Sequence, residues 1–338
     1  MKKKISLLII GSKDQHLIEN FYKKAFNSIG IKKVLFFSNE IYLSIFFFLK
    51  KIKLNFLFYP IRSLYFNKIC AFLEKHKKID VICVFKGIEI DKNFLVKLKK
   101  KFSSAKFVNV YTDDPFNYSS IATSSSLVPK AIPEYDFFFI YSKIIIKKLK
   151  KKYKFCNNFY YLPFGFHSRI KNMKQKKMET NYITFVGNAD EYRENIIKKI
   201  KKVKLNIFGD LWRNIENHSF NKQVLNNNYS KILRKSFISI NILREQNAGS
   251  HNMKTFEIPA QGALLLTSRS YEQNSFFPEN KACVMFDSAR ELENKILFLK
   301  KNKKIAERIA RKGFEYSRKH SYINRAKYIL KVIYDGNV

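Results

Sequence analysis

The sequence predicts an α/β protein of two halves, each a doubly wound parallel β-sheet with helices on both faces. Strand-length apolar runs alternate with helical stretches through most of the 338 residues. Continuous apolar strands separated by helices are typical of a parallel sheet that is buried on both faces. The alternation is interrupted by a polar, charged stretch at 167–181 that has no apolar period and indicates a linker. The length also fits two domains better than one.

The first half begins with KISLLIIG, a strand-like run followed directly by the helix-like DQHLIENFYKKAFNSIG. The predicted strands are 4–11, 32–38, 80–87, 106–115 and 135–142, and the predicted helices are 14–30, 91–102 and 143–153. The most apolar segment, 41–61, is split by Lys50, Lys51 and Lys53, so it falls short of the ~20 apolar residues of a membrane span. It fits a covered helix of the first half, which we favour, or an aromatic face resting on an anionic membrane.

The second half repeats the alternation after the linker. Its predicted strands are 182–187, 203–210, 237–243, 263–268 and 282–286, and its predicted helices are 192–202, 229–236 and a helix that contains Glu257. Pro259 is unfavourable inside a helix, so the helix with Glu257 should be short or kinked. Three helical stretches close the chain at 288–338.

These elements predict the domain boundaries and the place of a site. The predicted parts are a first domain 1–167, the linker 168–181, a second domain 182–318 and a closing C-terminal helix 319–338. Two such domains should face a cleft, and open α/β sheets bind ligands outside the carboxyl ends of their strands. The loops that follow strands hold most of the unusual residues of this chain.

The composition favours a globular protein with a large core and reduced cysteines. Hydrophobic residues make up 46% of the chain, and the four cysteines are scattered without metal-binding spacing. The first residues resemble the start of a signal peptide, but their apolar core is short and no cleavage site follows, so they fit a first strand better. We therefore expect a cytoplasmic protein, with the inner membrane face as a peripheral location.

The formal net charge of +38 raises the question of a nucleic-acid partner. Lysine is spread over nearly every predicted helix, and asparagine, isoleucine and phenylalanine, which share A/T-rich codons with lysine, are inflated with it. Codon bias therefore explains most of the charge, and anionic partners share the rest. The sequence has no recognisable RNA-binding aromatic motif or concentrated basic arm, so we expect no specific nucleic acid.

The segment SHNMKTFEIPAQGALLLTS, residues 250–268, carries the main candidate site. Asn252 is a plausible N-cap, and the helix that starts there would direct free N–H groups, with Lys254 in its first turn, at an anion such as a diphosphate. Glu257 lies about one turn further on, where its carboxylate can accept hydrogen bonds from the hydroxyls of a ribose. The alternative for Glu257 is a solvated helix residue.

Further candidates follow other strands. Gly187 ends a strand and lets the backbone approach a ligand, and Arg193 could hold a diphosphate with its guanidinium or form a surface pair with a neighbouring glutamate. Arg244 ends the strand before the main segment. Trp212, the single tryptophan, could stack on a base or pack in the wall of the cleft.

In the first half, the sequence YTDDP ends a strand with Asp113 and Asp114. Three roles compete for this pair: turn formation before a proline, a general base for the hydroxyl of an acceptor, and a metal site. His16, in the loop after the first strand, is another candidate base, although a solvated or capping role fits it better.

Several segments resemble the spore-maturation (CgeB-like) glycosyltransferase family of GT-B architecture. The resemblance rests on SHNMKTFEIPAQGALLLTS together with YLPFGF, YITFVGNADEYREN, LNIFGDLW and GFEYSRKHSYINRAKYIL, which occur in the family order across about 105–330. It implies two Rossmann-like domains, an N-terminal one for the acceptor and a C-terminal one for a nucleotide-sugar.

The resemblance also assigns roles to single residues. It implies that Glu257 binds the ribose, that Lys254 replaces a frequent arginine and that Gly262 ends the helix. Related enzymes often carry a sugar-binding carboxylate eight positions earlier, where this chain has Gly249. Glu245 or His251 could substitute for it.

The sequence therefore predicts a GT-B enzyme, a hexosyltransferase-type glycosyltransferase that needs no metal or other cofactor. It would move a sugar from a nucleotide-sugar donor to a glycan, lipid-linked or protein acceptor, as in the synthesis of cell-surface glycans. The alternatives are a nucleotide-sugar epimerase or hydrolase of the same fold, a scaffold-only GT-B protein, and a non-enzymatic basic nucleic-acid-binding protein.

Overall fold

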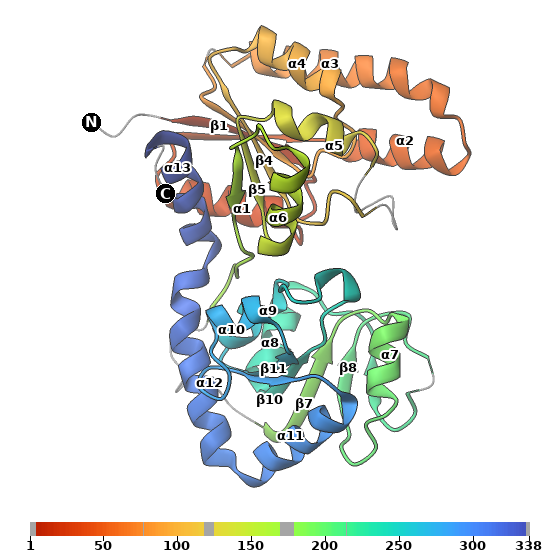
Figure 1. The fold of residues 1–338 in the computed structure, drawn as a ribbon, viewed down its shortest axis with the longest axis vertical. Helices are drawn as coiled ribbons and strands as arrows, with labels where there is room; N and C mark the ends of the chain where they lie inside the picture. Colours follow the sequence, from red (N-terminus) through yellow and green to blue (C-terminus); the bar gives the residue numbers. More distant parts are fainter. Residues whose placement is uncertain (1–4, 77, 118–124, 170–178, 214, 336–338) are drawn as a thin grey trace. The chain divides into compact units, whose positions relative to one another are not determined.

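The computed structural model describes residues 5–76, 78–117, 125–169, 179–213 and 215–335 (Figure 1). The chain divides into two compact units. Unit 1 comprises 1–163 together with 323–338, and unit 2 comprises 164–322. Each unit is described by itself below.

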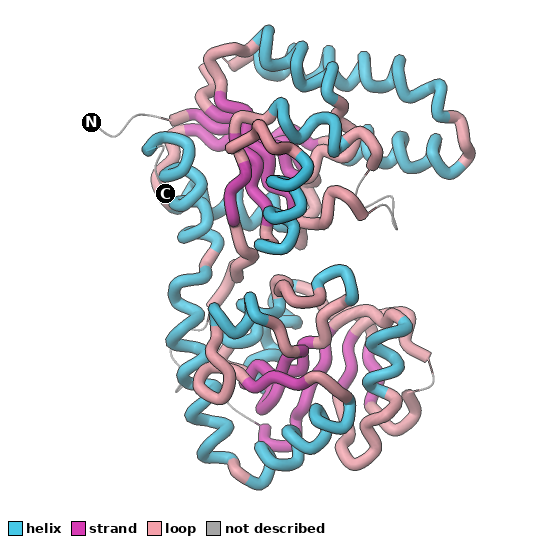
Figure 2. Tube along the Cα trace, viewed as in Figure 1, coloured by secondary structure: helices cyan, strands magenta, loops and turns pink. Residues whose placement is uncertain are grey.

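Unit 1 is built on a six-stranded parallel sheet with strand order β2-β1-β3-β4-β5-β6. Its strands are β1 Ser6–Gly11, β2 Lys33–Ser38, β3 Val81–Phe85, β4 Lys106–Tyr111, β5 Phe137–Ile140 and β6 Phe159–Tyr161. Its helices are α1 Ile18–Ser28, α2 Glu40–Lys51, α3 Phe58–Glu74, α4 Lys92–Lys101, α5 Val128–Ala131, α6 Lys143–Lys152 and α13 Tyr322–Asp335. Helices lie on both faces of the sheet, so its central strands are apolar throughout (Figure 2).

Helix α13 completes unit 1 rather than closing unit 2. Arg325 Nε donates a hydrogen bond to the Pro163 carbonyl at 2.9 Å, and the ring of Tyr328 lies 6.4 Å from that of Phe139 on β5. The boundaries predicted from the sequence were 167/168 and 318/319. The observed division falls at 163/164 and 322/323, and it returns the last helix to the first unit.

The apolar segment 41–61 forms helix α2 and the start of α3, which lie antiparallel (Figure 1). Phe46 and Leu49 of α2 are buried, but Ile41, Phe48 and Phe56 are largely exposed. The expectation of a covered helix is therefore wrong for one face of this segment. None of the helices in the described ranges is both long enough and apolar enough to cross a bilayer.

Unit 2 contains a second six-stranded parallel sheet, with strand order β12-β11-β10-β7-β8-β9. Its strands are β7 Glu179–Val186, β8 Asn206–Phe208, β9 Ser219–Asn221, β10 Ser236–Asn241, β11 Leu264–Ser268 and β12 Val284–Phe286. Its helices are α7 Glu191–Ile197, α8 Asn226–Lys235, α9 Lys254–Ala260, α10 Tyr271–Phe276, α11 Ala289–Lys301 and α12 Lys303–Ser317.

The two sheets confirm the predicted α/β class with two doubly wound parallel halves. The short strands β6 and β9, each at the edge of its sheet, were not predicted. Of the predicted linker 168–181, residues 170–178 lie outside the described residues, and β7 begins at Glu179 rather than at 182.

Candidate functional site

The strand order of unit 2 reverses between β7 and β10, and this point places the candidate site. Open α/β sheets bind their ligands outside the carboxyl ends of the strands at such a switch point. Strand β7 ends at Val186 and is followed by Gly187, while β10 ends at Asn241 and leads towards α9. The segments singled out from the sequence therefore meet at one edge of this sheet.

Helix α9 has the short form that its sequence predicts. The Asn252 Oδ1 atom accepts a hydrogen bond from the Thr255 N–H at 3.2 Å, so Asn252 makes a capping contact, although the N-cap position of the helix is Met253, one residue later than predicted. The Asn252 side-chain amide donates to Asn241 Oδ1 at 2.9 Å, so the cap is anchored on β10. Gly262, at φ +77°, ends the helix after Pro259 because a left-handed residue is needed there.

Glu257 lies on α9 and is partly buried rather than fully solvated. Its Oε2 atom accepts a hydrogen bond from the Tyr229 hydroxyl of α8 at 3.1 Å. Burial raises the pKa of the Glu257 carboxyl, although Lys254 and the Tyr229 hydrogen bond act in the opposite direction. The Tyr229 hydrogen bond fixes the orientation of the Glu257 carboxylate, and the charge of Lys254 offsets only part of the cost of burying it. Such a carboxylate is suited to accept hydrogen bonds from a ligand.

Lys254 lies one turn before Glu257 and is also partly buried. Burial lowers the pKa of the Lys254 ammonium to about 8, with the positive charges of Arg193 and Arg244 acting in the same direction and Glu257 against them. Glu257 is the strongest of these charge interactions, but it compensates Lys254 only in part, because the pKa of the ammonium stays below the ordinary lysine value. The arrangement therefore favours binding of a negatively charged group.

The two arginines near Lys254 differ in accessibility. Arg193 is buried, and its Nε and one terminal nitrogen donate to the Ile242 carbonyl at 3.0 and 2.8 Å, while the other donates to the Asn188 carbonyl at 3.1 Å. Its guanidinium therefore joins the segments after β7 and β10. The sequence suggested that Arg193 binds a diphosphate or forms a surface pair with Glu191 or Glu194. The structure corrects both expectations, because the guanidinium is buried and already donates to backbone carbonyls.

Arg244 is exposed, and its Nε lies 3.4 Å from Asp190 Oδ2. Asp190 also caps α7 by accepting the Arg193 N–H through Oδ1 at 3.0 Å. Because one exposed ion pair holds Arg244 only weakly, its side chain can turn to a ligand at little cost. Arg244 and Lys254 are the cations available to an anion at this edge.

Gly187 and Trp212 belong to two loops in close contact. The Gly187 N–H donates to the Phe208 carbonyl at 2.7 Å, and the indole N–H of Trp212 donates to the Gly187 carbonyl at 2.9 Å. The Trp212 ring also meets the Phe185 ring edge-on at 5.3 Å. Of the two roles expected for Trp212, the structure shows packing.

His251 lies below the surface instead of on it. The side chain is 0% exposed, its Nδ1 lies 2.9 Å from Glu272 Oε2, and its Nε2 accepts the Phe164 N–H at 3.2 Å. Since Nε2 is an acceptor, the proton belongs on Nδ1, where it is donated to Glu272. The prediction that His251 contacts the donor, or substitutes for a missing carboxylate, is wrong. Its ring instead links the segment before α9 to Phe164 and Glu272.

Gly249 has a backbone reason for departing from the family pattern. Its φ is +73°, in the left-handed region that disfavours residues with a Cβ. The carboxylate expected at this position from the resemblance would require a strained backbone. Among the substitutes considered, Glu245 is exposed, whereas His251 is not.

Gly249→Glu is therefore expected to destabilise the protein by about 1–2 kcal/mol and not to improve binding of a sugar nucleotide. Thermal unfolding measures the loss, and Gly249→Asn serves as the control because asparagine tolerates left-handed backbone better. A Gly249→Glu protein as stable as the parent would contradict the strain argument.

In unit 1, the strand order turns between β1 and β3, and the acidic pair follows the neighbouring strand β4. Asp113 Oδ2 lies 2.6 Å from Lys86 Nζ. Asp114 accepts the Phe116 N–H through Oδ1 at 2.9 Å and the Lys148 ammonium through Oδ2 at 3.0 Å. Asp114 thus has the turn role, and Asp113 is the candidate base of the two.

His16 lies in the loop after β1, where its backbone N–H donates to Asp14 Oδ1 at 2.9 Å. Glu19 is buried behind the same loop, and burial raises the pKa of its carboxyl. Within the described part of the chain, no group of three or more His, Cys, Asp or Glu side chains could hold a metal ion.

Four residues with clear roles were not predicted. Asp190 was the one with a readable signal, because an aspartate directly before a helix is a common cap. Tyr229, Glu272 and Lys86 act through partners distant in the sequence, which a single sequence does not reveal.

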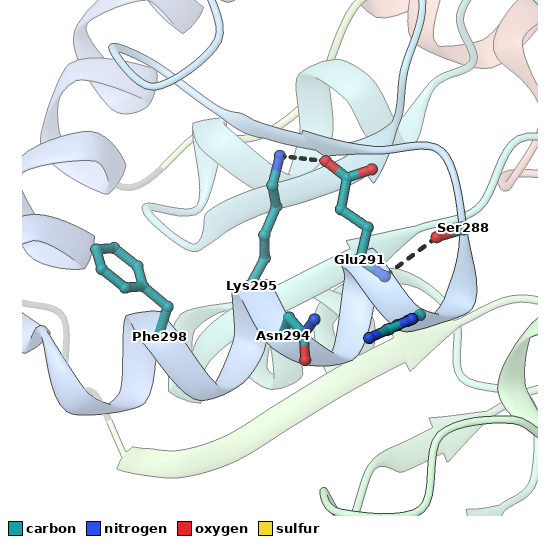
Figure 3. A pocket seen from close by; sticks show the side chains of 6 residues that line it. Ser288, Glu291, Asn294, Lys295 and Phe298 are labelled. Carbon is teal, nitrogen blue, oxygen red and sulfur yellow. Dashed lines mark hydrogen bonds and ion pairs between the residues drawn. The ribbon is translucent and has the colours of Figure 1, made fainter.

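A surface depression elsewhere on unit 2 is separate from these residues. It has a volume of about 410 Å³ and is lined by Ser288, Arg290, Glu291, Asn294, Lys295 and Phe298 (Figure 3). All lining residues belong to α11 or its cap, and Lys295 pairs with Glu291 at 2.8 Å. The hollow is open, lies along one helix, and has Glu291 and Lys295 engaged with each other, so we place the site at the switch point.

A family model described as "Glycosyl transferase-like" matches residues 193–331, which include α9. A search of curated proteins gave no match.

Among solved structures, TarM from S. aureus, crystallised with UDP and α-GlcNAc-glycerol, has a TM-score of 0.57 and 13% identity over 78% of this chain. The chain spans 58% of the length of that structure. Sucrose-phosphate synthase from Thermosynechococcus elongatus has a TM-score of 0.68 and 11% identity, covering 98% of this chain and 100% of its own. HepE from Anabaena, in complex with UDP, has a TM-score of 0.63 and 8% identity with the same coverage.

These comparisons confirm the GT-B fold with Rossmann-like halves. Beyond the fold, the family model matches residues 193–331, which is the part of the chain that contains most of unit 2.

Proposed function

We propose that this chain is a glycosyltransferase that takes a sugar from a nucleotide-sugar and transfers it to a hydroxyl-bearing acceptor. The donor would bind to unit 2 at the carboxyl ends of β7 and β10. The closer resemblance to the spore-maturation (CgeB-like) family rests on the sequence motifs and is part of this proposal.

One observation carries the proposal: Lys254 and Glu257 stand one turn apart on α9, an incompletely neutralised cation followed by a directed carboxylate. A nucleotide-sugar presents the complementary pair, an anionic diphosphate next to a ribose with two hydroxyls. The UDP complexes of TarM and HepE show that proteins of this fold bind a nucleoside diphosphate.

The chemistry follows from the charges. The bond between the anomeric carbon and the diphosphate oxygen breaks, a bond from that carbon to the acceptor oxygen forms, and the acceptor proton passes to a base. Negative charge grows on the departing diphosphate, where Lys254 and Arg244 would stabilise it without a metal ion. Asp113 is the candidate base in unit 1, with His16 as the alternative.

A glycan, a lipid-linked sugar or a protein would serve as acceptor, and the protein would act in the cytoplasm. The glycan is favoured because the TarM structure is a complex with α-GlcNAc-glycerol as well as UDP.

A thermal-shift panel of nucleoside diphosphates and nucleotide-sugars tests the proposal. Ligand at about 100 times its Kd stabilises the native state by about 2.7 kcal/mol, so binding to unit 2 should raise Tm by several degrees. The same panel with Glu257→Ala should show little or no shift. Equal shifts in both proteins would place the nucleotide elsewhere.

Product analysis separates the proposed transferase from an epimerase or hydrolase of the same fold. A transferase consumes donor in proportion to added acceptor, whereas an epimerase or hydrolase converts donor without it. A scaffold-only protein would bind the donor and convert none.

The affinity for a nucleoside diphosphate such as UDP is expected to fall as the pH rises through about 8. Lys254 is charged below its pKa of about 8 and loses its proton above it, whereas phosphates, with a second pKa of about 6, are already ionised. The apparent Kd should therefore increase by up to about tenfold per pH unit above 8. Calorimetric titration across this range measures the change.

Lys254→Arg is the matched control, because arginine keeps its charge and should flatten the profile. In contrast to the affinity, the contribution of Lys254 to the stability of the free protein should increase as the pH rises. The pKa of Lys254 is lowered from 10.5 on folding, so the unfolded chain binds more protons between about 8 and 10.5, and this contribution to stability rises with pH. Parallel affinity curves for the two proteins would contradict the assignment of Lys254.

A further inference from the structure

The helical hairpin formed by α2, the turn at 52–57 and α3 carries a surface that the proposed function does not use. This hairpin, residues 40–74, extends away from the sheet of unit 1 (Figure 1). Between Glu40 and Glu74 the sequence has no acidic residue, but it has five basic ones. Such a composition is unusual for the outward face of a helix pair, which normally mixes both signs of charge.

The inner side of the hairpin is firmly packed. Phe46 and Phe58 stack with ring centroids 4.6 Å apart, Tyr42 and Tyr65 lie 4.4 Å apart, and Tyr65 lies 5.4 Å from Phe94 of α4. The Tyr65 hydroxyl also donates to the buried Glu89 carboxyl at 3.0 Å. The hairpin is therefore held in place by its inner side chains, and its outer side chains take no part in that core.

The outer side chains are apolar, which is the reverse of the usual pattern. Ile41, Ile45, Phe48 and Ile52 follow each other at spacings of four, three and four residues, so they form one stripe along α2. Phe56 and Tyr59 at the turn are 72% and 77% exposed, and Phe48 is 60% exposed. Exposed large apolar side chains in this hairpin are Ile41, Ile45, Phe48, Ile52, Leu54, Phe56, Tyr59 and Leu64.

Lysines stand beside this stripe without counter-ions. Lys50, Lys51 and Lys53 are exposed at the end of α2 and in the turn, and no described residue forms an ion pair with them. Arg62 differs because it pairs with Asp91 at 2.7 Å, which turns it towards α4. Three of these cations thus lie at the same end of the hairpin as the most exposed aromatic rings, while Lys68, which is also exposed, lies further along α3.

We infer that this hairpin docks on the surface of an anionic lipid bilayer. The apolar stripe and the rings at the turn would enter the boundary between headgroups and acyl chains, while the three lysines contact lipid phosphates. Charge decides the occupant: a second copy of the chain would bring the same lysines against one another. Nucleic acid would leave the aliphatic stripe in water.

Sedimentation of the full chain with vesicles of phosphatidylcholine and about one third phosphatidylglycerol tests the inference. Each lysine near such a surface contributes about 1 kcal/mol, so replacing Lys50, Lys51 and Lys53 by alanine should weaken partitioning about 100-fold. The matched control replaces Lys147, Lys150 and Lys151 of α6, which are also exposed, and removes the same charge. It should weaken partitioning less than about fivefold.

The apolar contribution has its own pair of variants. Phe56→Ser should weaken partitioning about tenfold, whereas Phe155→Ser, at a residue that is fully exposed elsewhere in unit 1, should not. Phe56→Trp in a Trp212→Phe background should show a blue-shifted emission with the anionic vesicles. Thermal unfolding of each free variant verifies that it is folded.

Three outcomes would overturn the inference. Equal losses from the hairpin and α6 lysine variants would mean general polycation binding, and full partitioning of Phe56→Ser would mean that no ring enters the bilayer. A change of oligomeric state in the hairpin variants with vesicle binding intact would make the hairpin a protein interface. None of these readouts uses donor or acceptor, so failure here is distinct from failure of the proposed glycosyl transfer.

Discussion

Replacing Glu257 by glutamine is expected to weaken nucleotide-sugar binding about 10- to 100-fold while leaving the free protein folded. Hydrogen bonds to a charged group contribute about 1.5–3 kcal/mol, and the amide loses the charge and one acceptor oxygen. Burial raises the pKa of Glu257, so the neutral amide removes a cost of ionisation, but it also removes the charge that partly compensates Lys254, and these two effects on stability oppose each other. Calorimetry gives the affinity, and thermal unfolding gives the stability of the free protein.

Tyr229→Phe is the graded control for this result. It removes the hydroxyl that holds Glu257 Oε2 at 3.1 Å but keeps the carboxylate, so we expect a loss of about two- to tenfold. A glutamine variant that binds donor normally would exclude Glu257 from the site. A variant that unfolds at a much lower temperature would make Glu257 a structural residue.

Arg193→Ala is expected to cost about 2–4 kcal/mol of stability, because it removes three hydrogen bonds to backbone carbonyls at the ends of β7 and β10. For a unit of this size that corresponds to a fall in Tm of roughly 5–15 °C. Arg244→Ala is the matched control: it removes an exposed arginine whose ion pair contributes little, so its Tm should change by no more than about 2 °C.

For UDP affinity we expect the opposite order, with a larger loss in Arg244→Ala than in Arg193→Ala. Arg244→Ala should weaken UDP binding about tenfold, because an exposed cation near Lys254 is free to contact phosphate. Arg193→Lys should recover only part of the lost stability, since an ammonium cannot span the same carbonyls. An Arg193→Ala protein with normal Tm and weakened UDP binding would restore the role that the sequence suggested.

The sequence predicts the architecture well because buried parallel strands are continuous apolar runs. Strands β1, β3 and β10 were recognisable for this reason, and the cap at Asn252 and the stop at Gly262 follow from local backbone chemistry. The outward face of α2 was misjudged, since an apolar helix pattern does not reveal which of its sides the fold covers.

The sequence predicted the region of the candidate site, and the incorrect predictions for single residues within it have one cause. Arg193 and His251 are residue types that often bind anions, but here carbonyls and a carboxylate from distant segments already engage them. Such partners, like Tyr229 for Glu257, come together only through the sheet topology. Residue type and local spacing therefore located the region, and the fold decided which side chains within it remain accessible.

The return of α13 to unit 1 has a consequence for how the chain is made. Unit 2 is one continuous segment, but unit 1 is assembled from the first 163 residues and the last 16. Unit 1 is therefore complete only after a segment that follows the whole of unit 2 has been made, and Phe139 meets Tyr328 only when that segment packs against it. A chain that lacked residues 323–338 would therefore lose part of unit 1, although those residues lie far from the rest of that unit in the sequence.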